Sequence, residues 1–204
     1  MIADRIAAKF PTRFQQHYVR TKVKTDPLYD AVYQRVQGRD EPLLDVGCGM
    51  GLLALYLRER GHSAPIRGLD HDAQKVATAR ALGVECDLGD AREFPPWPGA
   101  VLLLDLLHYF DDATQAALLA RAAEHASMVI IREAVRDDSW RYRATYMQES
   151  FARAIGWLKA ERLNFPQRET IVAPFSAFEH EIVPLMGRTP FNNYLFVFRR
   201  VTAG

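Results

Sequence analysis

Residues 43–54, which read LLDVGCGMGLLA, constrain the fold of this chain more than any other stretch. An apolar segment ends in Asp45, three glycines follow at alternate positions, and an amphipathic segment comes next. This is the pattern of a strand, a tight turn and the start of a helix. Gly47, Gly49 and Gly51 let the backbone turn sharply and come close to a ligand, toward which the first helical N–H groups point. The stretch predicts a nucleotide-binding loop; the alternative is a glycine-rich turn without chemical meaning.

The spacing of these glycines separates two classes of nucleotide site. A dinucleotide-binding loop reads G-x-G-x-x-G and aims a helix dipole at a pyrophosphate. Here the pattern is D-x-G-x-G-x-G, and an acid ahead of the glycines suits an ammonium group better than a phosphate. The stretch resembles motif I of the class I S-adenosylmethionine-dependent methyltransferases. The resemblance implies S-adenosyl-L-methionine as cofactor, S-adenosyl-L-homocysteine as product and a Rossmann-like α/β fold.

Length and charge exclude several classes of protein. The 204 residues, 49% of them hydrophobic, fit a single domain with a sizeable core. Because 26 basic and 25 acidic side chains leave a formal charge of +1, we expect no nucleic-acid partner. No apolar run approaches the roughly 20 residues of a membrane span, and the first ten residues lack the apolar core of a leader peptide. We therefore expect a cytoplasmic protein.

Cys48 and Cys86 are the only cysteines of the chain. They have no C-x-x-C spacing, so they indicate neither a disulfide framework nor a zinc site, and we expect both to be reduced and no metal to be bound. Cys48 lies within the glycine loop, where a small residue between glycines accounts for it. A catalytic thiol at this position is the alternative.

Two further acids follow expected strands, as Asp45 does. Asp70 ends the second strand, 19 residues after Gly51, where an acid can accept from both ribose hydroxyls; the alternative role is a helix N-cap. By the resemblance, Asp90 accepts from the adenine amino group and the N–H of Ala91 meets the ring. For Asp90 the alternative is a local Asx-turn, with Asp87 as a competing ligand.

The segment at 100–105 is almost wholly apolar, as expected of a central strand that is buried on both faces. Because open α/β sheets bind ligands beyond the carboxyl ends of their strands, Asp105, His108 and Tyr109 should border the transferred methyl group. We expect His108 to deprotonate or orient an oxygen-bearing acceptor, with Tyr109 as the second catalytic candidate. The alternative is that His108 only packs against a neighbouring helix. The full set of cofactor-binding candidates is Asp45, Gly47, Cys48, Gly49, Gly51, Asp70, His71, Asp90, Ala91, Asp105 and Leu106.

Hydrophobic periodicity and turn residues predict the remaining elements. The resemblance implies a seven-stranded sheet of order 3-2-1-4-5-7-6, with strand 7 antiparallel, helices on both faces and a helical lid. Pro184 fits an edge strand. Helices are expected at 2–18, 27–37, 52–60, 71–82, 112–125 and 137–162, and strands at 43–46, 65–70, 84–86, 100–105, 128–133, 181–186 and 193–198.

Two segments outside the sheet carry the substrate candidates. Residues 1–40 form an N-terminal helical cap, in which the basic segment 18–24 would fold over the cofactor and present Tyr18 and Arg20. The lid at about 137–165 contributes Tyr146 and Glu149. The alternatives are a solvated basic surface for the first segment and an ordinary core stripe for the aromatic residues of the second.

Three segments resemble methyltransferases of aryl polyene and related pigment or lipid synthesis systems. They read RTKVKTDPLYDAV, DLLHYFD and GRTPFNNYLFVFRR. We therefore expect in-line methyl transfer to a small-molecule or carrier-bound acceptor, aromatic or acyl, without a metal or a covalent enzyme intermediate. The runner-up is a cofactor-binding but catalytically inert partner protein of a biosynthetic system. An oxidoreductase is disfavoured, because it would need the dinucleotide spacing.

Overall fold

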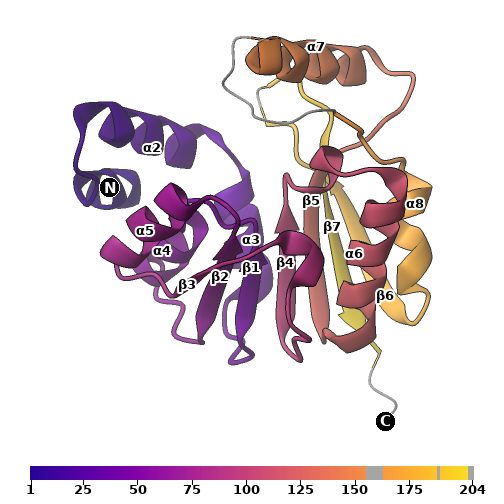
Figure 1. Ribbon diagram of the computed structural model, residues 1–204, viewed down its shortest axis with the longest axis horizontal. Coiled ribbons are helices and arrows are strands. Elements are labelled where there is room, and N and C mark those ends of the chain that lie inside the picture. The colour runs from indigo at the N-terminus through magenta and orange to yellow at the C-terminus, as the bar shows by residue number, and fades with distance from the viewer. Residues whose placement is uncertain (155–162, 188, 202–204) are drawn as a thin grey trace. The chain divides into compact units, whose positions relative to one another are not determined.

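The computed structural model describes residues 1–154, 163–187 and 189–201 (Figure 1). Its seven strands have the order β3-β2-β1-β4-β5-β7-β6, which confirms the predicted α/β topology. The chain divides into two compact units, Met1–Phe94 and Pro95–Gly204. Each unit contains its own strands and helices.

The first unit contains three parallel strands, β1 (Leu43–Val46), β2 (Ile66–Asp70) and β3 (Cys86–Leu88). All four residues of β1 are buried, as expected of an inner parallel strand. Helices α4 (Leu52–Glu59) and α5 (Ala73–Ala81) connect the strands. Strand β3 starts two residues later than predicted, because the turn that ends α5 extends to Val84, whose N–H donates to the carbonyl of Ala79.

The predicted helix at 2–18 is wrong, because the chain forms two helices there. Helix α1 (Ile2–Ala8) ends before a bend, and α2 (Arg13–Thr25) begins after Thr12. Thr12 and Gln15 form a capping box, which fixes the start of the second helix. The basic segment 18–24 is thus part of α2. Helix α3 (Leu28–Val36) follows Pro27 as predicted.

The second unit begins with β4 (Ala100–Leu104) and β5 (Met128–Ala134), which pair in parallel. Strand β7 (Asn193–Arg200) is antiparallel to β5, and β6 (Phe178–Pro184) is antiparallel to β7. Strand β6 lies at the edge and ends at Pro184, which confirms the edge position. It starts three residues earlier than predicted, and its connection to β7 is longer than a tight turn.

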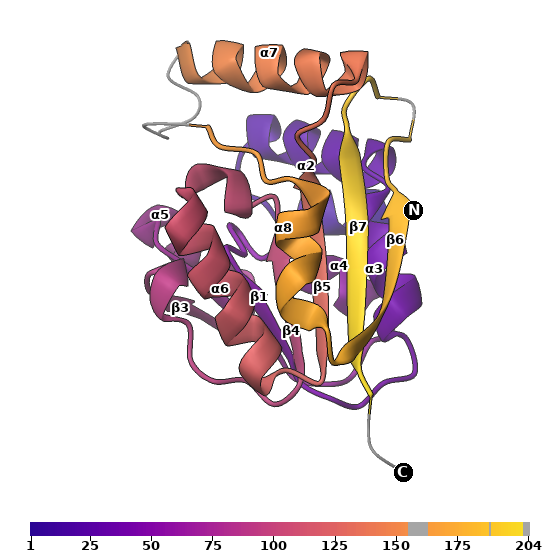
Figure 2. The ribbon, with the colours of Figure 1, turned by 90° about the vertical axis from the view of Figure 1, so that its right-hand side faces the viewer.

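Helix α6 (Asp112–His125) starts as predicted, because the side chain of Asp111 accepts from the Thr114 N–H. The sequence did not predict the short helices α8 (Arg168–Val172) and η3 (Ala173–Phe175). Figure 2 shows α6 and α8 alongside one another over one face of β4 and β5. The ring of Phe175 stacks on that of Phe198 in β7, with 3.9 Å between the ring centroids. This contact attaches η3 to the sheet.

Helix α7 (Trp140–Ala154) forms the described part of the predicted lid; the rest of the expected helix, at 155–162, lies outside the described residues. Within the described ranges, no helix is both long and apolar enough to cross a membrane.

The two glycines Gly51 and Gly38 allow a matched test of the packing around the loop. Both have φ +71°, but a Cβ on Gly51 would lie 2.9 Å from Val84 Cγ1, whereas a Cβ on Gly38 would meet nothing within 4 Å. Gly38→Ala should therefore cost only the left-handed strain, about 1 kcal/mol. Gly51→Ala should cost a further ~1–3 kcal/mol of overpacking. Urea unfolding of the two variants measures both; equal losses would show that the Val84 contact is not tight.

Candidate active site

The glycine loop lies against the end of β2. The N–H groups of Gly47 and Cys48 both donate to the carbonyl of Leu69, at 2.7 and 3.1 Å. Gly47, Gly49 and Gly51 all have positive φ, between +57° and +82°. Side chains with a Cβ rarely adopt these angles, so the alternating glycines follow from the path of the backbone. Helix α4 then starts at Leu52 without a side-chain cap, which leaves its first N–H groups for a ligand.

The Asp70 side chain connects the glycine loop to the segment between β2 and α5. Its Oδ2 accepts the Gly49 N–H at 2.7 Å, its Oδ1 accepts the Asp72 N–H at 2.9 Å, and the residue is buried. The N-cap alternative for Asp70 is wrong, because Asp72 caps α5 by accepting from N–H groups of its first turn. Each carboxylate oxygen has a second lone pair. Asp70 can therefore hold the loop and still accept from hydroxyl groups of a ligand.

Asp45 is a buried acid without a partner in the described part of the first unit. The residue is 4% exposed, and no residue in the described ranges forms a hydrogen bond or ion pair with its carboxylate. Burial and the charge of Asp70 raise the pKa of Asp45 to about 7. A buried carboxylate without a partner is unfavourable unless a cation or a proton compensates it. An ammonium group beside the glycine loop would satisfy it, so these residues fit the cofactor that the sequence implies.

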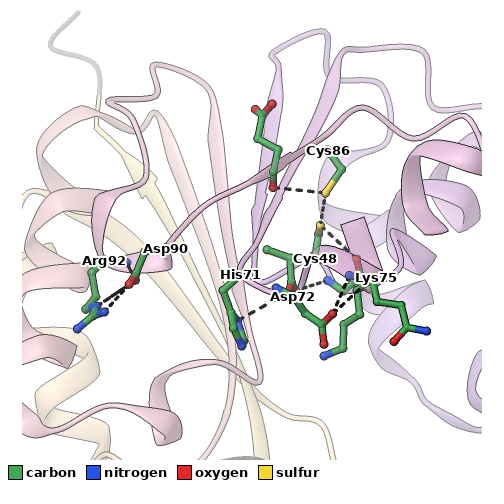
Figure 3. A network of polar contacts seen from close by, with 11 residues as sticks. Cys48, His71, Asp72, Lys75, Cys86, Asp90 and Arg92 are labelled. Carbon is green, nitrogen blue, oxygen red and sulfur yellow. Dashed lines mark hydrogen bonds and ion pairs between the residues drawn. The ribbon is translucent and has the colours of Figure 1, made fainter. Parts of the chain in front are cut away.

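Asp90 makes local contacts. Its Oδ1 accepts the Arg92 N–H at 2.8 Å, and its carboxylate pairs with the Arg92 guanidinium (Figure 3). It caps the short helix η1 (Ala91–Glu93), so the local Asx-type turn is present. The adenine contact of Asp90 and Ala91 remains a prediction. Asp87, the competing candidate, lies in β3 and pairs with Arg67.

His71, which follows Asp70, is largely exposed, and its Nδ1 lies 3.7 Å from Asp70 Oδ1. The His71 ring therefore lies beside the Asp70 carboxylate on its solvent-exposed side. A contact of His71 with the cofactor remains a prediction.

In the second unit, the end of β4 has a left-handed residue and a partly buried ion pair. Asp105 has φ +54°, the only positive value at a non-glycine residue in the described ranges. Its N–H donates to the Arg132 carbonyl, and its Oδ2 accepts from Arg132 Nη1 at 2.7 Å. Leu106 then precedes η2 (Leu107–Tyr109). Backbone strain of this kind is frequent at functional sites.

His108 is buried and is oriented by Glu133 of β5. The ring nitrogen Nδ1 lies 2.7 Å from Glu133 Oε1, and the backbone N–H of His108 donates to Oε2. This contact places the proton on Nδ1 and leaves Nε2 as a base. Nε2 is buried without a hydrogen-bond partner in the described residues. Burial lowers the pKa of His108, but the charge and hydrogen bond of Glu133 outweigh it, so the net pKa is raised.

Glu133 was not among the residues predicted from the sequence. It lies in a strand of which every residue is buried, and an ionisable residue in such a strand is a signal that could have indicated it.

Aromatic rings surround this histidine. Phe165 stacks on the His108 ring at 5.0 Å, and Tyr146 of α7 contacts Phe165 edge-on. Burial raises the pKa of Tyr109, as do the charges of Glu149 and Asp105, so its phenol stays protonated at neutral pH. The second unit therefore brings His108, Tyr109 and Tyr146 into one cluster of rings, close enough to Glu149 for its charge to act on both His108 and Tyr109.

The substrate candidates of the N-terminal cap lie on α2. Tyr18 is 40% exposed, and Arg20 Nε donates to Asp4 Oδ1 at 2.8 Å. The Arg20 guanidinium therefore attaches α2 to α1. Contact of Tyr18 and Arg20 with a substrate remains a prediction.

Comparison with known proteins agrees with this geometry. Residues 43–127 match the family described as "Methyltransferase domain". The matched segment runs from β1 to just before β5 and includes the glycine loop and Asp70, so this part of the chain is similar to a methyltransferase domain. A trans-aconitate 2-methyltransferase of Mycobacterium ulcerans (strain Agy99) is 33% identical over 104 residues, which are 51% of this chain and 36% of that protein. The corresponding enzyme of Mycobacterium tuberculosis (strain ATCC 25177 / H37Ra) is 36% identical over 72 residues, or 35% of this chain and 28% of that protein.

The fold extends the likeness beyond the matched segment. The magnesium protoporphyrin IX methyltransferase of Synechocystis PCC 6803, solved with bound S-adenosylhomocysteine, superposes with a TM-score of 0.66 at 18% identity. The superposition covers 97% of this chain and 92% of that one. The chain spans about a third of the length of the curated relatives it matches.

Because the Asp45 carboxyl group is buried without a partner in the described residues, we expect its ionisation to lower the free energy of unfolding of the cofactor-free protein. An acid with its pKa raised to about 7 in the folded state favours folding at low pH and loses that contribution as pH rises from about 4 to 7. Asp45→Asn should therefore stabilise the protein by about 1–3 kcal/mol at pH 8 and by much less at pH 4.5. Denaturant unfolding at the two pH values measures this. A variant that is less stable than the parent at pH 8 would contradict it.

Proposed function

We propose that this protein is a class I S-adenosylmethionine-dependent methyltransferase, which transfers the methyl group of its cofactor to an oxygen of a small-molecule or carrier-bound acceptor, aromatic or acyl. The observation that carries the proposal is the buried carboxylate of Asp45, without a partner in the described residues, beside a glycine loop held by Asp70. A carboxylate in this position suits an ammonium group and not a phosphate. The pattern therefore favours a cofactor that contains an amino acid.

Three features of the first unit would hold the cofactor. Asp45 would pair with the ammonium group, the first N–H groups of α4 would face the cofactor, and Asp70 would accept from ribose hydroxyls. When bound, the cofactor supplies an electrophilic methyl group. The chain has to hold this group in line with the acceptor, and such positioning can lower a barrier by roughly 7–11 kcal/mol.

We further propose that His108 accepts the proton that the acceptor oxygen loses. Glu133 fixes the tautomer in which Nε2 is the unprotonated nitrogen, and it stabilises the imidazolium that forms. Tyr109, whose phenol stays protonated, would donate a hydrogen bond to the acceptor. The contacts of His108 with Tyr109 and Phe165 shield the base from water.

The ring cluster favours a flat acceptor. Its rings come from η2, from the segment before α8 and from α7, the described part of the lid. The curated relatives named above are trans-aconitate 2-methyltransferases. Assays should therefore include trans-aconitate together with phenolic and acyl acceptors. Transfer to none of them, despite tight cofactor binding, would favour the inert-partner alternative.

Asp70→Ala should weaken cofactor binding. The variant loses a charged acceptor for ribose hydroxyls, and such bonds contribute about 1.5–3 kcal/mol each. We expect a Kd for S-adenosylmethionine at least tenfold higher by calorimetry, and weak binding of NAD to the parent. Asp87→Ala, which removes an acid of β3 that pairs with Arg67, is the matched control and should leave the Kd unchanged. An unchanged Kd in Asp70→Ala would contradict both the ribose contact and the dependence of the cofactor site on this carboxylate.

His108→Gln should lower turnover by ~10²–10⁴-fold, the usual contribution of a general base. Cofactor affinity should not change. Glu133→Gln removes the charge that raises the pKa of His108, so the acidic limb of the pH–rate profile should move to lower pH. A merely structural role of Glu133 would lower the rate without moving this limb. A loss of turnover below threefold in His108→Gln would contradict base catalysis.

A further inference from the structure

Cys48 and Cys86 meet in the first unit, although they are 38 residues apart. Their sulfur atoms lie 3.2 Å from one another, and Figure 3 shows the two side chains side by side. Cys48 belongs to the glycine loop and Cys86 begins β3. The sequence spacing suggested no relation between these thiols.

Gly68 of β2 makes this contact possible. Cys86 is its register partner in β3, and the Cys48 N–H donates to the carbonyl of the next residue, Leu69. A Cβ on Gly68 would lie 2.5 Å from the sulfur of Cys48 and 3.3 Å from that of Cys86. Because Gly68 has no side chain, there is room beside it for the two sulfur atoms to meet.

The glycine loop depends on the position of Cys48. Its neighbour Gly49 donates the 2.7 Å hydrogen bond to Asp70. A disulfide would need the two sulfur atoms to approach to about 2.05 Å, which moves Cys48 toward β3. Because Gly49 follows directly, that movement would displace the N–H that Asp70 accepts.

We propose that Cys48 and Cys86 form a redox-sensitive modification site that closes to a disulfide and lowers the affinity of the glycine loop for its cofactor. Cys48 is only partly buried and would react first. Its thiolate attacks the O–O bond of hydrogen peroxide, giving a sulfenic acid and hydroxide. The Cys86 thiolate then attacks the Cys48 sulfur, the S–S bond forms and a second hydroxide leaves. With the two thiol protons, the balance is two thiols and one peroxide to one disulfide and two waters.

Burial raises the pKa of both thiols, so the thiolate fraction is small and we expect the oxidation to be slow while the loop keeps this position. The disulfide itself does not depend on the proposed function, whereas its effect on cofactor affinity does. A bound cofactor and the disulfide would compete for the position of the loop. The cofactor should therefore slow the cross-link.

The experiment treats the full chain with hydrogen peroxide, blocks free thiols and maps tryptic peptides by mass spectrometry. We expect a cross-linked pair of the peptides 40–58 and 81–92, 2 Da lighter than the reduced pair and split by dithiothreitol. Calorimetry should show at least tenfold weaker binding of S-adenosylhomocysteine after oxidation, restored by dithiothreitol. Peptides that carry only sulfinic or sulfonic acid would overturn the site, and unchanged affinity of the cross-linked protein would overturn the regulation.

Cys86→Ala supplies the control, because the residue lies outside the proposed cofactor contacts. The reduced variant should bind S-adenosylhomocysteine as the parent does and should keep its affinity after peroxide. Thermal unfolding verifies that it folds, and Cys86→Ser serves in its place if it does not. Loss of affinity in the oxidised variant would show that peroxide acts elsewhere. If neither parent nor variant binds the cofactor, the proposed function fails, while the peptide map still decides the disulfide.

Discussion

The hydrogen bond from the Gly49 N–H to the Asp70 carboxylate is the contact on which the proposed cofactor site depends. It joins the loop after β1 to the end of β2 at 2.7 Å. The same carboxylate accepts from Asp72, which begins α5. One buried side chain thus fixes a loop and the start of a helix, and it retains lone pairs for a ligand. The left-handed glycines are needed because the loop must turn back to reach Asp70.

Each proposed site contains a buried polar group without a protein partner in the described ranges. In the first unit this group is the carboxylate of Asp45, and in the second it is Nε2 of His108. Such groups cost stability, and proteins retain them where a ligand or a reaction compensates the cost. Glu133 orients the second group, whereas the first is held by the strand alone. The two groups match the two tasks of the proposed methyltransferase activity, which are cofactor binding and activation of the acceptor.

The sequence predicted the features that depend on local patterns. Apolar runs and cap residues predicted most strands and helix starts, whereas the strand order was implied by the resemblance to methyltransferases and is confirmed. The bend between α1 and α2 was missed, although Thr12 and Gln15 have the spacing of a capping box. The pairs Gly49–Asp70 and His108–Glu133, 21 and 25 residues apart, could not be predicted, because they depend on the register of neighbouring strands.

The most direct test of the account is the pKa of the Asp45 carboxyl group, measured by carbon-detected NMR titration with and without S-adenosylhomocysteine, which has the same α-ammonium and carboxylate groups as the cofactor. Without the ligand we expect a value near the raised one of about 7, because burial and Asp70 disfavour the charged form. With the ligand we expect a value well below that, because an adjacent ammonium group stabilises the carboxylate. An Asp45 pKa that does not change when the ligand saturates the protein would contradict the proposed cofactor site.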